Sequence, residues 1–447
     1  MFEHMSESEA KEKILEMVSE YYRTFHQKKE YHKGDRIPYA GRVYDEQEMT
    51  NLVDSALEFW LTSGRYTQEF EKGLAEFLNV REALFVNSGS SANLLAFMAL
   101  TSPLLKERAI QRGDEVITVS AGFPTTVSAI LQFGAVPVFA DVTIPQYNID
   151  VNSLEKALSP KTKAVILAHT MGNPFHIKAV KEFCDKNSLW LIEDNCDAFG
   201  SEYTLDGITK YTGTFGDIGT SSFYPPHHLT TGEGGAVYTN NALLAKIMRS
   251  LRDWGRDCVC RSGQDNLCGH RFDGQYGELP QGYDHKYTYS HFGYNLKATD
   301  LQASIGCAQL QKFQMFAQKR RENFVTLYNA LKDLQEYLIL PEACPDSSPC
   351  WFGFLITCQE GISRNAMVQY LESKGIQTRM LFAGNFIKHP CFDTLRASGE
   401  GYRVADSLEN TDRIMNDTFW IGVYPDMTPE MLQDMADCIH EAVRAQR

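Results

Sequence analysis

The segment AVILAHTMGNPFHIKAVKEFCDKNSLWLIED, residues 164–194, decides the fold class of this chain. It contains two short apolar runs, at 164–170 and 189–194, and the residues between them have the apolar spacing of an amphipathic helix. Two apolar runs joined by a helix are typical of a β-α-β unit with parallel strands. The first run is apolar at consecutive positions, which indicates a strand that is covered on both faces of the sheet.

The same alternation of strand and helix patterns extends through the middle of the chain. Further strand candidates lie at residues 83–88, 115–121, 136–142, 220–225 and 234–240. We therefore predict an α/β fold with a mainly parallel seven-stranded sheet. The pattern beyond this sheet predicts a smaller C-terminal α+β domain. Its elements are expected at residues 351–358, 364–374 and 429–445, after a long helix at 299–334.

The expected organisation has three parts. They are an N-terminal helix and arm at residues 1–45, a large domain at 46–320 and a small C-terminal domain at 321–447. Within the large domain, residues 253–293 are rich in Gly, Asp and Cys and predict a long cysteine-containing loop. Loops of this length in a compact domain are usually functional or disordered.

Composition narrows the classes of function. The chain has 447 residues, with 43 Lys and Arg against 57 Asp and Glu, and a formal net charge of −14. This balance argues against nucleic-acid binding, which needs a basic surface. The sequence has no apolar run long enough to span a membrane and no secretory signal pattern, so we expect a cytoplasmic protein. Its 11 cysteines are too few for a disulfide scaffold, and clustered ones are more typical of metal ligands or reactive thiols.

Three polar segments stand out as candidate site elements. Asp194 ends an apolar strand, where open α/β sheets bind ligands, although a turn or helix-cap aspartate is an equal alternative. The run 87–91, NSGSS, precedes a helical pattern and could bind phosphate with backbone amides or simply cap the helix. The third segment is SSFYPPHHLTTGEGG, 221–235, with His227 and His228 between two prolines and several glycines. A single histidine is more often structural, but these surroundings favour a ligand site.

The order of the motifs NSGSSAN, AGFPTT, EDNCDA, SFYPPHH, GEGGAV and GYNLKATDLQA resembles the sugar aminotransferase–dehydratase family, of the DegT/DnrJ/EryC type. The resemblance covers roughly residues 35–440. It implies the fold of aspartate aminotransferase, fold type I of the pyridoxal phosphate (PLP) enzymes. It also implies that PLP or pyridoxamine phosphate (PMP) is the cofactor.

The resemblance implies roles for individual residues. Asp194 would pair with the pyridinium nitrogen of the cofactor, and Phe123 would stack on its ring. The cofactor phosphate would be held by Ser88, Gly89, Ser90 and Ser222. Asn295 matches a residue that reaches the phosphate of the neighbouring subunit's cofactor, which implies a homodimer with shared active sites.

One departure from the family pattern is informative. Its aminotransferases carry a lysine five residues after the serine that is Ser222 here, and that lysine binds the cofactor as a Schiff base. This sequence has His227 at that position and no lysine between Lys210 and Lys246. Imidazole cannot form a Schiff base, but it accepts a proton near neutral pH. We therefore expect noncovalently bound PMP and a dehydration at C3 with His227 as the base; His228 ranks second.

The cysteines resemble those of one branch of the family, the 3-dehydrases that act on CDP-4-keto-6-deoxy-D-glucose. In that branch a cysteine near the pyridoxal aspartate and a C-x-C-x7-C run hold a [2Fe-2S] cluster with four thiolates. The matching residues are Cys196, Cys258, Cys260 and Cys268. The interval after Cys196 is slightly longer here, and we expect 204–213 to hold the extra residues as a surface loop. A zinc site and free thiols are the alternatives.

The resemblance also implies partners. Electrons for the reduction that follows dehydration would come from a separate iron–sulfur flavoprotein reductase, relayed singly by the cluster. Products of this branch enter dideoxyhexoses of bacterial surface polysaccharide, such as the O-antigen of lipopolysaccharide. Candidates for the diphosphate of the nucleotide sugar are Arg42, Arg65 and Arg403, because guanidinium groups suit phosphate oxygens. Solvent-exposed arginines are the equal alternative.

Two other functions stay open. The first is a cluster-free dehydratase of a GDP- or dTDP-linked keto sugar, which recycles PMP with glutamate and needs no set of cysteines. The second is a cofactor-binding regulator that has lost its lysine and turns over no keto sugar.

Overall fold

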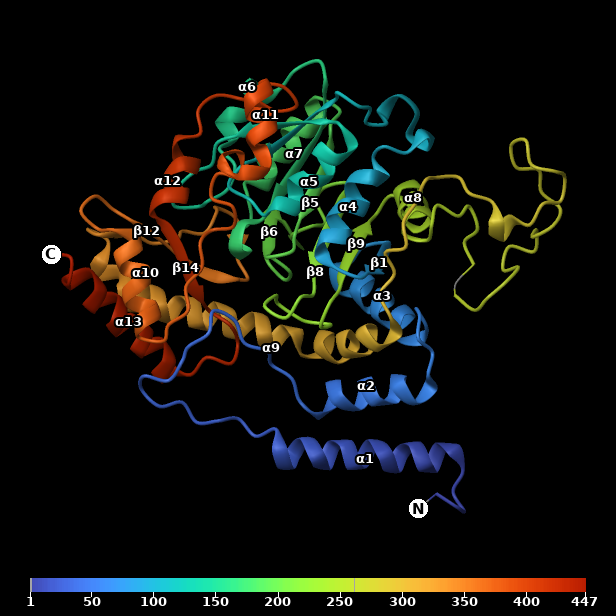
Figure 1. The fold of residues 1–447 in the computed structure, drawn as a ribbon, viewed down its shortest axis with the longest axis horizontal. Coiled ribbons are helices and arrows are strands. Elements are labelled where there is room, and N and C mark those ends of the chain that lie inside the picture. The colour runs from blue at the N-terminus through green and yellow to red at the C-terminus, as the bar shows by residue number, and fades with distance from the viewer. Residues whose placement is uncertain (1, 261) are drawn as a thin grey trace.

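A computed structural model describes residues 2–260 and 262–447 of the chain (Figure 1). Its centre is an eight-stranded sheet in the order β1-β9-β8-β5-β4-β2-β3-β13. The strands are β1 Glu82–Val86, β2 Glu115–Val119, β3 Val136–Ala140, β4 Thr162–Ala168, β5 Trp190–Asp194, β8 Ile218–Ser222, β9 Gly235–Thr239 and β13 Arg403–Val404. Neighbouring strands from β8 through β5, β4, β2 and β3 to β13 are parallel, while β9 is antiparallel to β1 and β8.

The mainly parallel sheet is confirmed, and all seven predicted strands are present. The sequence prediction missed β13, which adds an eighth strand at one edge. This strand has two residues, too few to show a pattern of apolar side chains.

Helices cover both faces of the sheet. The helices of the molecule are α1 Glu7–Phe25, α2 Glu46–Glu58, α3 Arg65–Leu78, α4 Gly89–Ala99, α5 Pro124–Phe133, α6 Leu154–Ala157, α7 Ile177–Lys186, α8 Ala242–Arg252, α9 Asp300–Leu331, α10 Arg364–Ser373, α11 Asp393–Ser398, α12 Glu409–Asp417 and α13 Pro429–Arg444. One core joins α4, α5 and α8 to the sheet, and the opposite face packs against α7, α3 and the first half of α9. Burial of both faces explains the continuous apolar strands.

A second, antiparallel sheet of three strands lies toward the C-terminus. Its order is β10 Leu338–Ile339, β12 Gly353–Cys358 and β14 Thr418–Gly422, and it shares a core with α10 and α13. The 32-residue helix α9 connects the two sheets, because its first half packs in the core of the large sheet and Phe324 and Leu327 pack in that of the small one (Figure 1). A capping box of Thr299 and Gln302 fixes its start.

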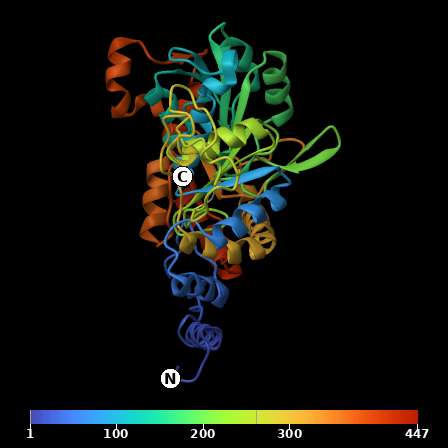
Figure 2. The ribbon, with the colours of Figure 1, turned by 90° about the vertical axis from the view of Figure 1, so that its right-hand side faces the viewer.

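Two segments project from the body. Residues 204–213, expected as a surface loop, include most of a hairpin of β6 Glu202–Leu205 and β7 Ile208–Tyr211, to which β11 Ser347–Ser348 adds a third strand (Figure 2). Residues 253–260 and 262–293, drawn in yellow, extend away from the sheet and form the predicted long loop (Figure 1). Helix α1 lies beside α2 and has no buried residue. No helix among the described residues is long and apolar enough to cross a membrane.

Candidate active site

A cavity of about 430 Å³ opens where the parallel strands β4, β5 and β8 end, between the large sheet and the small one. Carboxyl ends of neighbouring parallel strands meet at one edge, where open α/β sheets bind ligands. The cavity brings together eight of the predicted site residues. They are Ser88, Gly89, Ser90, Phe123, Asp194, Cys196, Ser222 and His227.

Asp194, at the end of β5, is held so that its carboxylate faces this cavity. Its Oδ2 accepts hydrogen bonds from Asn93 Nδ2 and Thr126 Oγ1, both at 2.7 Å. Its Oδ1 accepts the backbone N–H of Cys196 at 3.2 Å. With 4% of its surface exposed, Asp194 is a fixed, buried negative charge that suits a cationic ring nitrogen.

The phosphate site predicted at 87–91 is a close-packed cradle at the start of α4. Ser88 is the N-cap, and its Oγ accepts the N–H of Ser91 at 3.0 Å. A Cβ on Gly89 would lie 2.4 Å from Ser222 Cβ, so only glycine lets the two segments approach this closely. The free amides of a helix start and two serine hydroxyls fit a phosphate group.

Phe123 supplies an aromatic wall. It precedes Pro124 at the start of α5, and 52% of its surface is exposed although it lines the cavity. Its ring contacts Phe382 edge-on with the ring centres 6.1 Å apart, which leaves a face free to stack on a ligand ring. The carboxylate, the cradle and this ring together fit a phosphorylated pyridine such as PLP or PMP.

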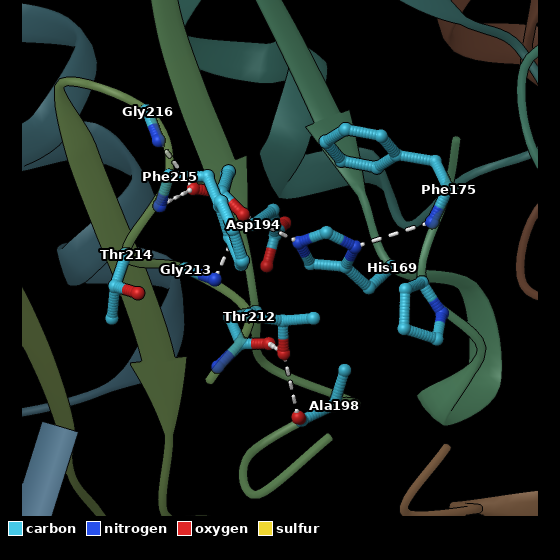
Figure 3. Close-up of polar contacts among 12 residues, drawn as sticks. His169, Phe175, Asp194, Ala198, Thr212, Gly213, Thr214, Phe215 and Gly216 are labelled. Carbon is cyan, nitrogen blue, oxygen red and sulfur yellow. Dashed lines mark hydrogen bonds and ion pairs between the residues drawn. The ribbon is translucent and has the colours of Figure 1, made fainter. Parts of the chain in front are cut away.

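A buried network behind Asp194 anchors the end of β5 (Figure 3). The Glu193 carboxylate is fully buried and accepts three backbone N–H bonds from residues 213–216, at 2.6 to 2.8 Å. It also contacts His169 Nε2 at 2.9 Å, while His169 Nδ1 accepts the N–H of Phe175 at 3.3 Å. The contact between Glu193 and His169 was not predicted from the sequence. The one sign of it in the sequence is the acidic doublet of Glu193 and Asp194 at the end of a strand.

His227 faces the cavity next to a second carboxyl group, Asp197. Its Nδ1 lies 3.3 Å from Asp197 Oδ1, and both side chains are largely buried. Burial and the positive charge of Arg320 lower the pKa of His227 to about 4, against the opposing charge of Asp194 and a hydrogen bond with the backbone of Cys196. Burial and the charge of Asp194 raise the pKa of Asp197 to about 8. The imidazole is therefore neutral at physiological pH, the form that has a lone pair to accept a proton.

His228, the second-ranked base, turns away from the cavity. It is 2% exposed, and its Nε2 lies 2.7 Å from the carbonyl oxygen of Cys350. Burial lowers its pKa well below the ordinary value. The prediction of a site role for His228 is not supported, since its ring holds two backbone segments together.

The structure does not bring the three predicted arginines into the cavity. Arg65 pairs with Asp54 and with Glu58, its Nε 2.8 Å from Glu58 Oε1. Arg403, in β13, binds Glu115 Oε2 at 2.7 Å, and Arg42 is exposed at a separate small recess.

The arginine that does line the cavity is Arg379, which the sequence interpretation missed. Its guanidinium lies 4.2 Å from the centre of the Tyr39 ring, and its Nη1 donates to Thr378 O at 2.8 Å. No motif marks this position, because its neighbours in the chain carry no recognisable pattern.

Asn295 lies outside the cavity of its own chain. It stands where the long loop rejoins the body, pairs with Asp253 through the backbone, and accepts a 2.7 Å hydrogen bond from Lys297 Nζ. Its predicted contact is with another subunit.

The four cysteines fall into two places. Cys196 lines the cavity, and burial with the charge of Asp194 raises its pKa well above the ordinary value. The other three lie in the long loop, where each sulfur accepts a backbone N–H at 3.4 Å, from Cys260, Leu267 and His270 respectively. No three metal-binding side chains of the described residues are arranged to hold an ion. The electrostatics of Cys258 includes Cys260 and Cys268 of the same loop. The cluster held by four thiolates stays a prediction from the sequence.

Several known proteins are similar in sequence to this chain. Residues 43–440 match the model of the DegT/DnrJ/EryC1/StrS aminotransferase family. The lipopolysaccharide biosynthesis protein RfbH of Salmonella typhimurium is 52% identical over 96% of this chain and 97% of the relative. A dTDP-4-dehydro-2,6-dideoxy-D-glucose 3-dehydratase of Saccharopolyspora spinosa is 47% identical over 97% of this chain and 92% of the relative.

A solved structure has the same fold. The GDP-4-keto-6-deoxy-D-mannose-3-dehydratase of E. coli with bound hydrated PLP has a TM-score of 0.79 and 26% identity, and the match covers 91% of this chain and all of that one. The predicted aminotransferase-like fold of PLP fold type I is thereby confirmed.

Proposed function

The chain belongs to the DegT/DnrJ/EryC1/StrS aminotransferase family, and we propose that it is a PMP-dependent 3-dehydratase of a nucleotide-linked 4-keto-6-deoxyhexose. The observation that carries the proposal is His227, which lines the cofactor cavity where the family's aminotransferases place lysine. None of the described residues that line this cavity is a lysine. Two of the relatives above are named 3-dehydratases of such sugars, one of them linked to dTDP and one to GDP, which supports the reaction.

The residues of this chain divide the chemistry among them. When bound, PMP supplies an amine that condenses with the sugar ketone and a ring that accepts an electron pair. Asp194 would keep the ring nitrogen protonated, and the cradle at Ser88 would hold the phosphate. His227 would take a proton from the carbon that carries the amine and would then give it to the hydroxyl that leaves C3. The proton and the hydroxyl would leave as water, and His227 would return to its neutral form.

Arg379 and Tyr39 line the end of the cavity nearest the small sheet, and we assign the nucleotide sugar to this end. The Arg379 guanidinium is half of a cation–π pair and keeps donors for phosphate oxygens. CDP-4-keto-6-deoxy-D-glucose is the proposed substrate, from the resemblance in the cysteine pattern.

A homodimer is the proposed assembly. The long loop exposes large apolar side chains, with Phe272 at 61% and Phe292 fully exposed. Asn295 stands at the base of the same loop, outside the cavity of its own chain. A partner subunit that covers the loop would bury this apolar surface and give Asn295 a cofactor to reach.

A [2Fe-2S] cluster fed by a reductase is the proposed source of electrons, and it rests on the cysteines of the loop. Their sulfurs accept amide N–H bonds, as cluster thiolates do. Cys196, the fourth expected ligand, lines the cofactor cavity. Iron and acid-labile sulfide after anaerobic purification test it: two of each per chain are expected, lost in Cys258→Ala and kept in the control Cys391→Ala, an exposed thiol outside the loop. Neither element in the wild-type protein would favour the cluster-free dehydratase.

The experiment that tests the proposed function is incubation with PMP and CDP-4-keto-6-deoxy-D-glucose, followed by mass spectrometry of the sugar. Loss of the C3 oxygen from the sugar is expected with the wild-type protein and not with His227→Asn, because the second hydrogen of the eliminated water comes from PMP. An amino sugar as the product would indicate a transaminase instead. No change in the sugar would favour the cofactor-binding regulator.

A further inference from the structure

We propose that Asp197 is the residue that orients His227, fixing the imidazole with Nδ1–H toward the Asp197 carboxyl group and Nε2 toward the reacting carbon. The inference rests on the proposed function and deepens it, because it concerns the base of the same site. Asp197 stands in the motif EDNCDA but carries no role in the resemblance.

The contact between the two side chains is the first observation. His227 Nδ1 lies 3.3 Å from Asp197 Oδ1, and both residues line the cofactor cavity. The buried Nδ1 has no aligned hydrogen-bond partner among the described residues. A buried ring nitrogen needs a partner, and catalytic hydrogen bonds that are poorly aligned without ligand tighten in the complex. Asp197 is the side chain within reach.

The backbone on the Asp197 side is held rigidly. Asp197 lies in the turn after β5, between Asn195 and Ala198. The Thr212 hydroxyl contacts both of these residues, 2.6 Å from Asn195 Oδ1 and 3.1 Å from Ala198 O. Figure 3 shows the bond between Thr212 and Ala198 below the end of β5. The turn therefore cannot shift Asp197 away from the cavity without breaking these bonds.

The backbone on the His227 side is held by Arg320, a fully buried guanidinium on α9. Its Nη2 donates to His227 O at 3.2 Å and to Pro226 O at 3.4 Å, and its Nη1 donates to Trp351 O and Phe352 O. This positive charge opposes a protonated imidazole. The charge of Asp194 acts on His227 in the opposite direction, and Asp197 interacts with the charge of Arg320 itself.

The contact with Asp197 determines which tautomer the His227 imidazole adopts. An imidazole that donates Nδ1–H leaves a lone pair on Nε2, and the carbonyl oxygen of a carboxyl group accepts that bond whether or not the group is ionised. Nε2 can then take one proton from the reacting carbon. The imidazolium that results is stabilised by the adjacent carboxyl group until it returns the proton to the leaving hydroxyl.

The test compares the wild-type protein with Asp197→Asn, using PMP and CDP-4-keto-6-deoxy-D-glucose. Asparagine has the same size, but it presents N–H donors to Nδ1 and selects the unreactive tautomer. We expect kcat to fall about 10²- to 10⁴-fold while KM and the Kd for PMP stay within about twofold. With PMP deuterated at its methylene carbon, the isotope effect on kcat is expected to increase, because proton transfer becomes rate-limiting. A structural role would not change this isotope effect.

Two further variants complete the experiment. Asp197→Glu keeps a carboxyl group, and its kcat is expected to be at least about tenfold higher than that of Asp197→Asn. If Asp197→Asn does not fold, Asp197→Glu carries the test, with a lowered kcat and a raised isotope effect expected. The matched control is Asp217→Asn, which removes another largely buried carboxylate, at the opposite end of β8, where it accepts the N–H of Leu191 at 2.9 Å.

Three results would overturn the inference. The first is a kcat of Asp197→Asn within about threefold of the wild type. The second is a kcat that falls together with a more than tenfold weaker binding of PMP, which indicates a structural role. The third is a wild-type protein that eliminates no water, which contradicts the proposed function as well. If the wild type is active and Asp197→Asn matches it, only this inference fails.

Discussion

At the scale of single residues, His227 decides what this site can do. The cavity has the carboxylate, the phosphate cradle and the aromatic wall that the family's aminotransferases need, but it lacks a lysine among its described lining residues. The same pocket can therefore bind the cofactor without a covalent bond. An imidazole held neutral by burial replaces the Schiff-base amine with a proton acceptor.

The variant His227→Lys tests whether His227 stands in place of the lysine that forms the Schiff base. We expect the variant to bind PLP covalently, because a primary amine at this position can form a Schiff base, and to lose dehydration of the keto sugar. Reduction with borohydride followed by intact mass measurement checks the bond. An unmodified mass, with dehydration retained, would contradict the assignment of His227.

Arg379 is the residue that we expect to bind the substrate phosphates. Arg379→Met keeps the packing on Tyr39 but removes the donors, and a lost charge-assisted hydrogen bond costs about 1.5–3 kcal/mol. KM for CDP-4-keto-6-deoxy-D-glucose should therefore rise about 10- to 100-fold with the melting temperature unchanged. Steady-state kinetics measure this change. An unchanged KM would place the nucleotide sugar elsewhere.

Residues whose role depends on a motif could be predicted from the sequence, and residues with long side chains could not. Asp194, Ser88 and His227 follow strand ends, and parallel strands bring such ends to one edge of the sheet. The side chain of an arginine reaches several ångströms in any direction, so its partner is not visible in the sequence. Arg403 pairs with Glu115 far along the chain, and Arg379 reaches the cavity from a segment beside β14.

At the scale of the elements, Arg403 ties the short strand β13 to the edge of the sheet. It binds Glu115 Oε2 at 2.7 Å and contacts the carbonyl oxygen of Ala157. We expect Arg403→Met to lower the free energy of unfolding by about 1–3 kcal/mol, because it leaves a part-buried carboxylate without its partner. Urea denaturation measures this loss, and an unchanged KM separates it from a role in substrate binding.

The free energy of unfolding that is lost in Arg403→Met should depend on pH. Arg403 and Ser159 hold the pKa of Glu115 below its ordinary value of 4.5, against the effect of burial. A carboxylate with a lowered pKa in the folded state adds stability above pH 4.5 and loses it as the pH falls through the folded-state pKa. The difference between wild type and Arg403→Met is therefore expected to be full at pH 7 and to fade in acid. A difference that grows in acid would contradict the ion pair.

The contact between the start of α4 and the end of β8 is the other element-scale feature. Gly89→Ala places a Cβ 2.4 Å from Ser222 Cβ, and overpacking of this kind costs about 1–3 kcal/mol. Because the strain falls on the phosphate cradle, we expect the Kd for PMP to rise by about tenfold or more, measured by fluorescence titration. Gly122→Ala is the control, since the nearest atom to its Cβ is at 3.8 Å. Equal affinity in both variants would argue against the cradle.

At the scale of the whole molecule, the sequence predicted the large sheet and the projecting loop but not how the cysteines lie. Seven strands are visible as apolar runs because helices bury both faces of the sheet. The place of a loop relative to the body depends on contacts that are few and scattered, such as that of Ser262 with Ser63 at 2.8 Å. A spacing of cysteines therefore indicates a candidate cluster without showing that its ligands meet.

The same loop leads to a prediction about assembly. Phe292 is fully exposed in the single chain, and a charge at that position should oppose burial against a partner subunit. Sedimentation of the wild-type protein is expected to give a dimer, and Phe292→Asp to raise the dissociation constant by about tenfold or more. The control is Ile208→Asp on the projecting hairpin, also well exposed. A wild-type monomer would contradict the proposed homodimer.

The most direct test of the proposed function follows the hydrogens of the PMP methylene group. Wild-type protein, or His227→Asn, is mixed with PMP deuterated at that carbon and with CDP-4-keto-6-deoxy-D-glucose, and deuterium appearing in the solvent is measured. We expect the wild type to release one deuterium with each water eliminated and His227→Asn to release none. Release at the wild-type rate by His227→Asn would show that another group takes the proton and would contradict the central role of His227.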